Sequence, residues 1–209
     1  MDKKGCSKNC KKGKIIPANN LVSICIPSYN GELYIEEAIK SALNQTYRNI
    51  EIVICDDVSS DKSWDIIESF CDERIRALRN SKNHGLVGNF RKVLSEARGQ
   101  YVTFLCNDDI LSVDTIEKSV EILEKNKGST FSFGNVEYIG CREGSTGYSF
   151  PALMHSEDYV KETIRRGKNI TYLVGTVFRK PLEPSEEIIS DLIFFDWHLW
   201  MRLSKNQIS

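Results

Sequence analysis

The amino-acid sequence predicts an α/β fold, in which helices cover both faces of an open, mainly parallel sheet. Short apolar runs rich in β-branched residues alternate with amphipathic segments between residues 22 and 125. This strand–helix order is typical of parallel sheets, because the chain crosses one face of the sheet as a helix between two parallel strands. Polar residues also gather directly after the strands, where ligands bind in sheets of this kind.

Strands and helices follow one another in the first two thirds of the chain. We expect strands at 22–26, 50–55, 74–78 and 101–106. We expect helices at 33–43, 61–70, 86–97 and 114–125. Apolar residues recur at helical spacing in these segments, as with Val87, Phe90 and Leu94. Asp61 and Asp114 are expected to cap the helices that they precede.

The last third of the sequence has a different pattern. Residues 130–139 and 170–178 are predicted to be strands, with a helix at 156–166 between them. A final amphipathic helix is expected at 196–204. No internal repeat or low-complexity segment interrupts the order.

The length and composition indicate one large folded domain behind a basic tail. The chain has 209 residues, and its 41% hydrophobic and 27% charged content is ordinary for a globular protein. Residues 1–20 carry many lysines and are predicted to be a flexible tail, either solvated or held near anionic lipid. Residues 21–209 are predicted to form the domain.

Charge and hydropathy exclude several classes of protein. The formal net charge of −1 gives no indication of nucleic-acid binding. No apolar run approaches the roughly 18–20 residues of a membrane span. The N-terminus lacks the apolar core of a signal peptide, so we expect a cytoplasmic protein.

The cysteines support the same location. Cys25, Cys55, Cys71 and Cys106 lie inside or beside apolar runs and are predicted to be reduced, buried thiols. The pair Cys6 and Cys10 is predicted to be two free thiols of the tail, because no second cysteine or histidine pair follows with zinc-ligand spacing.

Three polar loops follow three of the predicted strands. They are 27-PSYNG-31, 56-DDVSSD-61 and 107-NDD-109. Because the carboxyl ends of parallel strands share one edge of the sheet, we expect the loops to converge. Their carboxylates suit either a divalent cation such as Mg²⁺ or Mn²⁺, or a site for a base and a ribose. Neither GxGxxG nor GxxxxGK[ST] is present to hold phosphates.

Each acid pair also has a purely structural interpretation. Asp56 and Asp57 are followed by two serines and an aspartate, as in a turn before a helix cap. Asp108 and Asp109 precede a further aspartate that would cap the next helix. Two acid pairs at corresponding strand ends nevertheless favour a functional site, because like charges at contact distance resist joint ionisation.

The loops and helices together resemble the family 2 glycosyltransferases. The segment 25-CIPSYNGELYIEEAIKSALNQTYRNIEIVICDDVSSD-61 is similar to the opening of that family. The similarity continues through 83-NHGLVGNFRKVLSEARGQYVTFLCNDD-109 and reaches 195-FDWHLWMRLSK-205. Several long motifs in the same order, over about residues 21–205, make the resemblance specific.

The resemblance implies a GT-A fold, which is Rossmann-like, and an enzyme that transfers a sugar with inversion. The donor would be a nucleotide-diphospho-sugar, with UDP as the default nucleotide, and the acceptor a hydroxyl of a glycan or glycolipid. The cofactor would be Mn²⁺ or Mg²⁺. The site is implied to lie at the cytoplasmic face of the membrane, with peripheral membrane association, in polysaccharide or glycolipid biosynthesis.

The resemblance also implies roles for the residues that match the family's motifs. They are Pro27 and Tyr29 against the base, Asp57 as acceptor from a uracil-like ring, Asp108 at the ribose or diphosphate, Asp109 as metal ligand and Asp196 as catalytic base. An inverting transfer needs such a base to take the proton of the attacking hydroxyl. A carboxylate at the amino end of the helix 196–204 is also favoured in its ionised form.

The sequence departs from the family pattern at four places, one of which is Val58, where a glycine often follows the first acid pair. Cys106 stands where the common D-x-D-D motif has its first aspartate, and Phe195 stands where a glutamate usually precedes the catalytic aspartate. Family domains also continue past the position of Ser209, so we expect the C-terminal part of the catalytic domain to be missing from this chain.

Two alternatives from other classes remain open. One is a truncated domain that binds a nucleotide sugar without catalytic activity, which the departures favour. The other is a receiver-type phosphoacceptor domain, which also places acid pairs at strand ends. That class needs a lone aspartate after its third strand and a lysine after its fifth, and neither is evident here.

Overall fold

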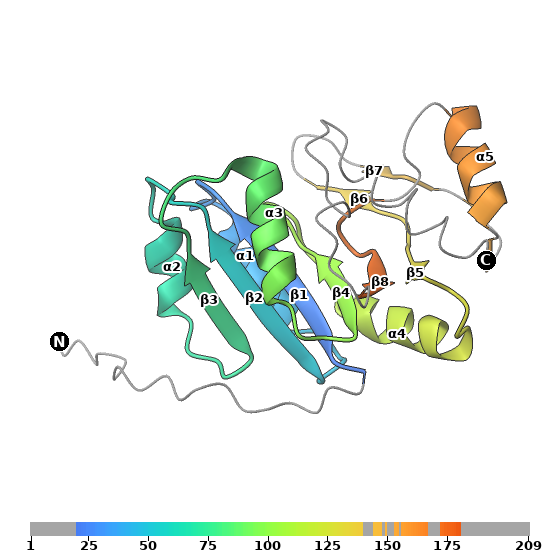
Figure 1. Cartoon of the computed structure of the whole chain (residues 1–209), viewed down its shortest axis with the longest axis horizontal. Coiled ribbons are helices and arrows are strands. Elements are labelled where there is room, and N and C mark those ends of the chain that lie inside the picture. The colour runs from blue at the N-terminus through green and yellow to red at the C-terminus, as the bar shows by residue number, and fades with distance from the viewer. Residues whose placement is uncertain are drawn as a thin grey trace.

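The computed structural model describes residues 20–139, 144–147, 149, 153–154, 156–166 and 172–180 (Figure 1). The strands in these residues are β1 (Val22–Ser28), β2 (Ile50–Asp56), β3 (Ile75–Arg79), β4 (Tyr101–Phe104), β5 (Phe131–Ser132), β6 (Glu137–Tyr138), β7 (Gly144–Ser145) and β8 (Val177–Arg179). The helices are α1 (Ile35–Leu43), α2 (Ser63–Ser69), α3 (Gly85–Glu96), α4 (Thr115–Lys125) and α5 (Ser156–Arg166).

The main sheet is mostly parallel. Its described strands lie in the order β3-β2-β1-β4-β8-β5. Strands β1 to β4 run in one direction, whereas β8 pairs antiparallel with both β4 and β5. A separate pair, β6 and β7, forms a small antiparallel ribbon. The prediction of an open, mainly parallel α/β sheet is therefore confirmed.

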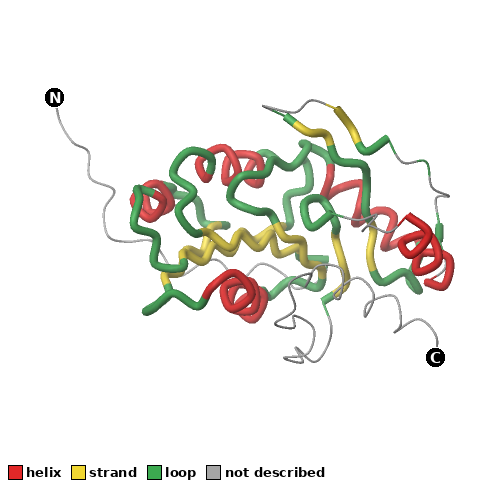
Figure 2. The backbone as a smooth tube through the Cα atoms, turned by 90° about the horizontal axis from the view of Figure 1, so that it is seen from above, coloured by secondary structure: helices red, strands yellow, loops and turns green. Residues whose placement is uncertain are grey.

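Helices cover both faces of this sheet, and Figure 2 shows the sheet between them. Alternate residues of each strand point to opposite faces. On one face, Ile24 and the strand residues that point to the same side pack against apolar residues of α1, α2 and α4. Ile39 of α1 is one of these helix residues. On the other face, Cys25 and Phe104 pack with α3 through Phe90. The central strands are buried on both faces, which is why their sequences are mostly apolar.

The two strands expected in the last third are shorter than predicted. The run 130–139 is split between β5 and β6, which belong to different sheets. Gly134 and Asn135 lie at the break, and both residue types are common in turns and rare inside strands. Within the described part of the run 170–178, the strand begins only at Val177, because Gly175 adopts a φ of 74° and turns the chain. Helix α5 agrees with its prediction.

Two smaller predictions need correction. Asp114 occupies the position before α4, but its side chain makes no capping hydrogen bond there. Its carboxylate instead pairs with Lys118 at 2.7 Å. Cys71 is exposed, because it lies beyond the end of α2, whereas Cys25 and Cys55 are buried and Cys106 is half-buried. None of these four described cysteines forms a disulfide.

Several predictions fall on residues outside the described ranges. They are the tail 1–20 apart from Asn20, the pair Cys6 and Cys10, and the helix 196–204. In the part of the chain that is described, no helix has the length and apolarity that a membrane crossing needs.

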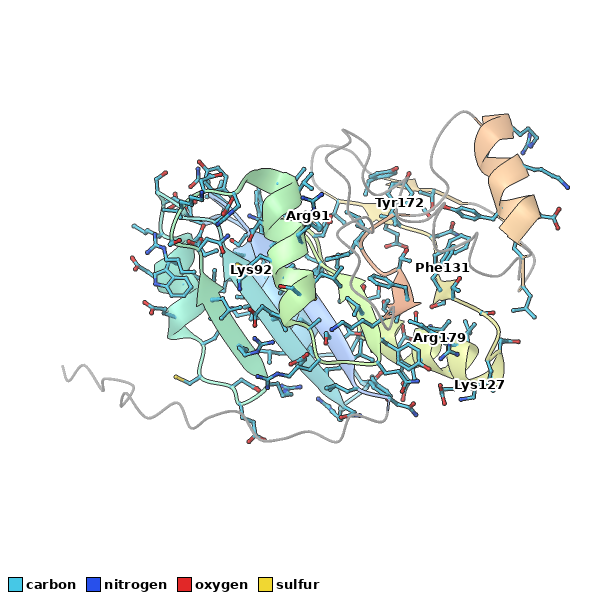
Figure 3. All side chains as sticks on the ribbon, in the orientation of Figure 1. Arg91, Lys92, Lys127, Phe131, Tyr172 and Arg179 are labelled. Atoms are coloured by element: carbon cyan, nitrogen blue, oxygen red, sulfur yellow. The ribbon has the colours of Figure 1, made fainter. Side chains whose placement is uncertain are left out.

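The short strand β8 is fastened to the parallel part of the sheet by an arginine. Arg179 donates hydrogen bonds to the Tyr101 hydroxyl at 2.8 Å and to the Leu123 carbonyl at 2.6 Å. Figure 3 shows Arg179 beside α4, where Leu123 lies. Burial, with a hydrogen bond to Glu124, raises the pKa of Tyr101 to about 12, so this hydroxyl keeps its proton. The arginine therefore links β8, β4 and α4.

A close backbone contact fixes the start of β4 against β1. The amide of Gly99 donates to Ser23 Oγ at 2.8 Å, and that hydroxyl donates to the buried Glu51 carboxylate at 2.6 Å. A Cβ atom on Gly99 would lie 2.6 Å from the Leu21 carbonyl oxygen and 2.7 Å from the Ser23 nitrogen and the Tyr101 oxygen. These are all backbone atoms, so no side chain can move aside.

We therefore predict that Gly99→Ala destabilises the protein by about 1–3 kcal/mol, the usual cost of overpacking. The matched control is Gly128→Ala, because nothing lies within 4 Å of a Cβ at that position. The control should be neutral or slightly stabilising, through the lower entropy of the unfolded chain. Urea denaturation of both variants measures the difference. Equal stability of the two variants would contradict this account of the β1–β4 contact.

Candidate functional site

The three polar loops converge at the carboxyl ends of β1, β2 and β4, as the sequence predicts. The amide of Asp57 donates to the Ser28 carbonyl at 2.9 Å, which extends the β1–β2 pairing beyond the strands. The side chain of Asn107 donates to the Tyr29 carbonyl at 3.4 Å. Gly31 allows this approach, since a Cβ there would lie 2.1 Å from the Asn107 amide nitrogen.

The loops after β1 and β2 are also bonded directly to each other. Asn30 Oδ1 accepts the amide of Ser60 at 2.9 Å, and Asp61 Oδ2 accepts the amide of Glu32 at 3.0 Å. Asp61 Oδ1 also accepts the amide of Ser63, the first residue of α2, at 2.9 Å. Lys62, not the predicted Asp61, stands at the N-cap position of α2, and Asp61 bonds the first amide of the helix from one residue earlier. The same carboxylate joins the two loops.

Asp56 shapes the turn that follows β2. Its buried carboxylate accepts the Ser59 amide at 3.0 Å and pairs with Arg79 Nε at 3.2 Å. The Ser59 hydroxyl also bonds the same carboxylate. These bonds hold Val58 at a φ of 62°, which is uncommon for a β-branched residue. The structural interpretation of the first acid pair is therefore correct for Asp56.

Asp57 is held differently. Its side chain is 2% exposed, and its Oδ1 accepts Asn80 Nδ2 at 2.7 Å and the His84 amide at 2.9 Å. The His84 amide also lies 3.1 Å from Oδ2. The His84 ring itself is exposed, so its backbone rather than its imidazole contributes to the site.

A pocket of about 300 Å³ lies beside Asp57. This volume is at the lower end of the range for small-molecule sites. It is lined by Pro27, Ser28, Tyr29, Asp57, Asn83, Gly85, Leu86, Asn89 and Asn107. Three of the predicted donor-binding residues, Pro27, Tyr29 and Asp57, are therefore brought together. Tyr29 is half-exposed, so its ring is available to an incoming ligand.

Several residues of the pocket and its surroundings are not among the predicted site residues. Asn83, Leu86 and Asn89 come from the start of α3 and the loop before it. Asn80, which bonds Asp57, follows β3 directly. Asn83, Leu86 and Asn89 lie within the segment 83–109 that resembles the family, whereas Asn80 is marked in the sequence only by the density of asparagines between positions 80 and 89.

The second acid pair forms a cluster with the preceding cysteine. Ligand atoms of Cys106, Asp108 and Asp109 all lie within 4.8 Å of one another. Asp108 is exposed, and Asp109 is half-buried. Burial, followed by the negative charge of Asp108, raises the pKa of Asp109, whereas a hydrogen bond from Cys106 lowers it. A divalent cation would relieve this repulsion between the carboxylates.

The remaining predicted site residue, Asp196, lies outside the described residues. The described part of the site therefore offers a buried carboxylate that faces a pocket and, in the neighbouring loop, a pair of carboxylates. A carboxylate with spare acceptor capacity suits a ligand that carries an N–H donor, and a carboxylate pair suits a hard cation.

Comparisons with known proteins bear on the family and the fold of the chain. The family model for glycosyl transferase family 2 matches residues 23–178. A UDP-Glc:alpha-D-GlcNAc-diphosphoundecaprenol beta-1,3-glucosyltransferase of Escherichia coli, WfaP, is 42% identical over 115 residues, which are 55% of this chain and 45% of that protein. An uncharacterised glycosyltransferase of Haemophilus influenzae is 39% identical over 161 residues, which are 76% of this chain and 59% of that protein.

The fold has a counterpart among solved structures. TarS residues 1–349 of S. aureus, crystallised in complex with UDP, superpose with a TM-score of 0.65 and 19% identity, over 88% of this chain and 55% of that one. This likeness confirms the predicted GT-A, Rossmann-like architecture. The main sheet of this chain contains the antiparallel strand β8, whereas the sheet of a receiver domain is all parallel. The receiver-type alternative is therefore wrong.

The chain spans about half the length of two curated relatives that it matches, with 45% and 47% of the two E. coli glucosyltransferases covered. The matched part contains all three strand-end loops and the pocket between them. The motifs, the sheet and the match to the family model over residues 23–178 lead to one conclusion: the chain belongs to glycosyl transferase family 2.

Proposed function

We propose that this chain is the donor-binding domain of an inverting glycosyltransferase, which moves a sugar from a nucleotide-diphospho-sugar to a hydroxyl acceptor. The observation that carries the proposal is the position of Asp57. It is buried, lines the pocket between the strand-end loops and keeps capacity to accept another hydrogen bond. The carboxylate cluster lies in the neighbouring loop, whose Asn107 contacts the same pocket.

The donor is proposed to be a UDP-sugar. Pro27 and Tyr29 would contact the base, and Asp57 would accept the N–H of a uracil ring, since a carboxylate can only accept. The names of two E. coli relatives specify UDP-Glc as their donor, so UDP-glucose is the first sugar to test.

The residues of the cluster fit a divalent cation. Asp109 would ligate it and Asp108 would face the ribose or the diphosphate, because Mg²⁺ typically takes one or two protein carboxylates while phosphates fill other positions. Oxygen ligands favour Mn²⁺ or Mg²⁺, whereas a cysteine sulfur is a softer donor that suits them less well. When bound, the cation would stabilise the negative charge of the departing diphosphate.

Asp196 is proposed as the catalytic base. It would take the proton of the acceptor hydroxyl as that oxygen attacks the anomeric carbon. Inversion follows from a single displacement, in which the acceptor enters opposite to the departing nucleotide. The acceptor is proposed to be a glycan or glycolipid at the cytoplasmic face of the membrane, in keeping with the lipid-linked acceptors in the names of the E. coli relatives.

A second candidate function is donor binding without turnover. One observation favours it, namely the presence of Cys106 where the family motif has an aspartate. The two candidates share the donor pocket, and they differ only in whether the bound sugar is transferred.

Donor binding is tested by thermal unfolding of the chain with UDP, GDP, dTDP and CMP, each with and without Mn²⁺. We expect UDP with Mn²⁺ to raise Tm by about 5–10 °C at a hundredfold excess over Kd, because ligand binding to the folded state stabilises it. Asp57→Asn should reduce the shift with UDP, and Asp109→Asn should remove the part that depends on Mn²⁺. The matched control is Asp65→Asn, at an exposed position of α2.

This proposal is wrong if no nucleotide produces a metal-dependent shift. Retention of the full shift in both Asp57→Asn and Asp109→Asn would instead mean that the nucleotide binds elsewhere.

Turnover is tested by the release of UDP from UDP-glucose in the presence of a short-chain GlcNAc-diphospho-lipid. We expect Asp196→Asn to lower the rate about 10²–10⁴-fold, the usual contribution of a general base. Its affinity for UDP should not change, because the base acts on the acceptor. Asp191→Asn, an aspartate five positions earlier, is the sequence-matched control. Binding of UDP by a wild-type chain that releases none would favour the second candidate function.

A further inference from the structure

The carboxylate of Asp57 is held by donors from two different elements. Asn80 Nδ2, directly after β3, lies 2.7 Å from Oδ1, and the amide of His84, directly before α3, lies 2.9 Å from the same oxygen. Oδ2 makes only the longer contact of 3.1 Å with that shared amide. Oδ2 is thus the oxygen with the larger remaining capacity to accept a hydrogen bond from a ligand.

The direction of the Asn80 amide follows from its partners. A carboxylate only accepts, so the NH₂ group of Asn80 must face Asp57. The amide oxygen is then left for the thiol of Cys55, whose Sγ lies 3.4 Å from Oδ1 of Asn80. Burial raises the pKa of Cys55 to about 11, so the thiol keeps the proton that it donates.

Asn89 gives Asn80 a second anchor. Its side chain is 3% exposed and donates to the carbonyls of Ser28 at 3.3 Å and Cys55 at 3.0 Å. Because its NH₂ group faces two carbonyls, its oxygen must be the atom that accepts Asn80 Nδ2 at 3.3 Å. The backbone amide of Asn80 also donates to the Asp56 carbonyl at 2.9 Å. The Asn80 side chain is therefore fixed at both ends before any ligand arrives.

We propose that Asn80 is a positioning residue for nucleobase selection, which acts on the ligand through Asp57. It is not among the described residues that line the pocket, so its effect on a ligand has to pass through the carboxylate that it holds. By engaging Oδ1, it leaves Oδ2 free as an acceptor for a ring N–H. Uracil carries such a donor at N3, and cytosine has an acceptor there. The inference rests on the proposed function, since it assumes that the pocket takes the base of a nucleotide.

The experiment compares the affinities of UDP and CDP, each with Mn²⁺, for the wild-type chain and for Asn80→Asp. We expect the wild type to prefer UDP, and we expect Asn80→Asp to lower the UDP/CDP affinity ratio at least tenfold. The substitution keeps the shape of the side chain but places a second carboxylate against Asp57. Two carboxylates at this distance share a proton, which turns the acceptor into a partial donor. Titration calorimetry measures the four affinities.

A second variant and a control separate base selection from a general loss of structure. Asn80→Ser removes most of the contact with Asp57 without adding charge, and it should also lower the UDP/CDP affinity ratio. If Asn80→Asp does not fold, Asn80→Ser provides the test. Asn44→Asp, exposed at the end of α1, is the charge-matched control and should leave the ratio unchanged. A purely structural role would weaken UDP and CDP equally.

The outcomes distinguish this inference from the proposed function. A wild-type chain that binds neither nucleotide would overturn the proposed function and, with it, the inference. A wild-type chain that prefers UDP, together with an unchanged ratio in the folded Asn80 variants, would overturn the inference alone.

Discussion

The hydrogen bond from the Asp57 amide to the Ser28 carbonyl is the contact on which the rest of the site depends. It continues the β1–β2 ladder one step beyond the strands, so the chain can turn only after Asp57 has reached the edge of the sheet. The buried Asp56 carboxylate then holds the turn through Ser59 and Arg79. The parallel pairing of β1 and β2, which is stabilised by burial of both faces, therefore determines where the side chain of Asp57 lies.

The remaining loops are fixed around this point by neutral and charged hydrogen bonds rather than by apolar packing. Asn89 joins the ends of β1 and β2 from the third helix, and Asn107 reaches the first loop from β4. Such a network is worth more when all of its members are satisfied, because an unpaired polar group in a buried site is costly. The pocket is therefore organised in the unliganded chain, which lowers the entropy lost on binding.

The sequence alone predicted most of the fold, for reasons that are physical. Strands such as β2 are buried on both sides and are therefore mostly apolar, and helices such as α1 need one apolar stripe. The predicted strand lengths were wrong where a glycine interrupts an apolar run. Gly175 interrupts an apolar run by adopting positive φ, and Gly134 separates residues that join different sheets. The spacing of apolar residues along the sequence does not reveal either of these two breaks.

The site was predicted in part. The residues that topology places at the strand ends were predicted, and those that depend on individual side-chain hydrogen bonds were not. The convergence of three loops and the gathering of Pro27, Tyr29 and Asp57 follow from topology, which the sequence pattern determines. The roles of Asn80 and Asn89 do not follow from topology, because they depend on which side-chain atoms meet across β3 and α3. The metal role of Asp109 and the catalytic role of Asp196 remain predictions.

The most direct measurement of the central claim, that the strand-end loops form one nucleotide site, is amide hydrogen exchange of the chain with and without UDP and Mn²⁺. The account predicts slower exchange in all the loops that surround the pocket, at residues 27–34, 56–63, 80–90 and 105–110, and unchanged exchange in the turn between α4 and β5. Unchanged exchange in these loops, or protection confined to a distant segment such as that turn, would contradict it.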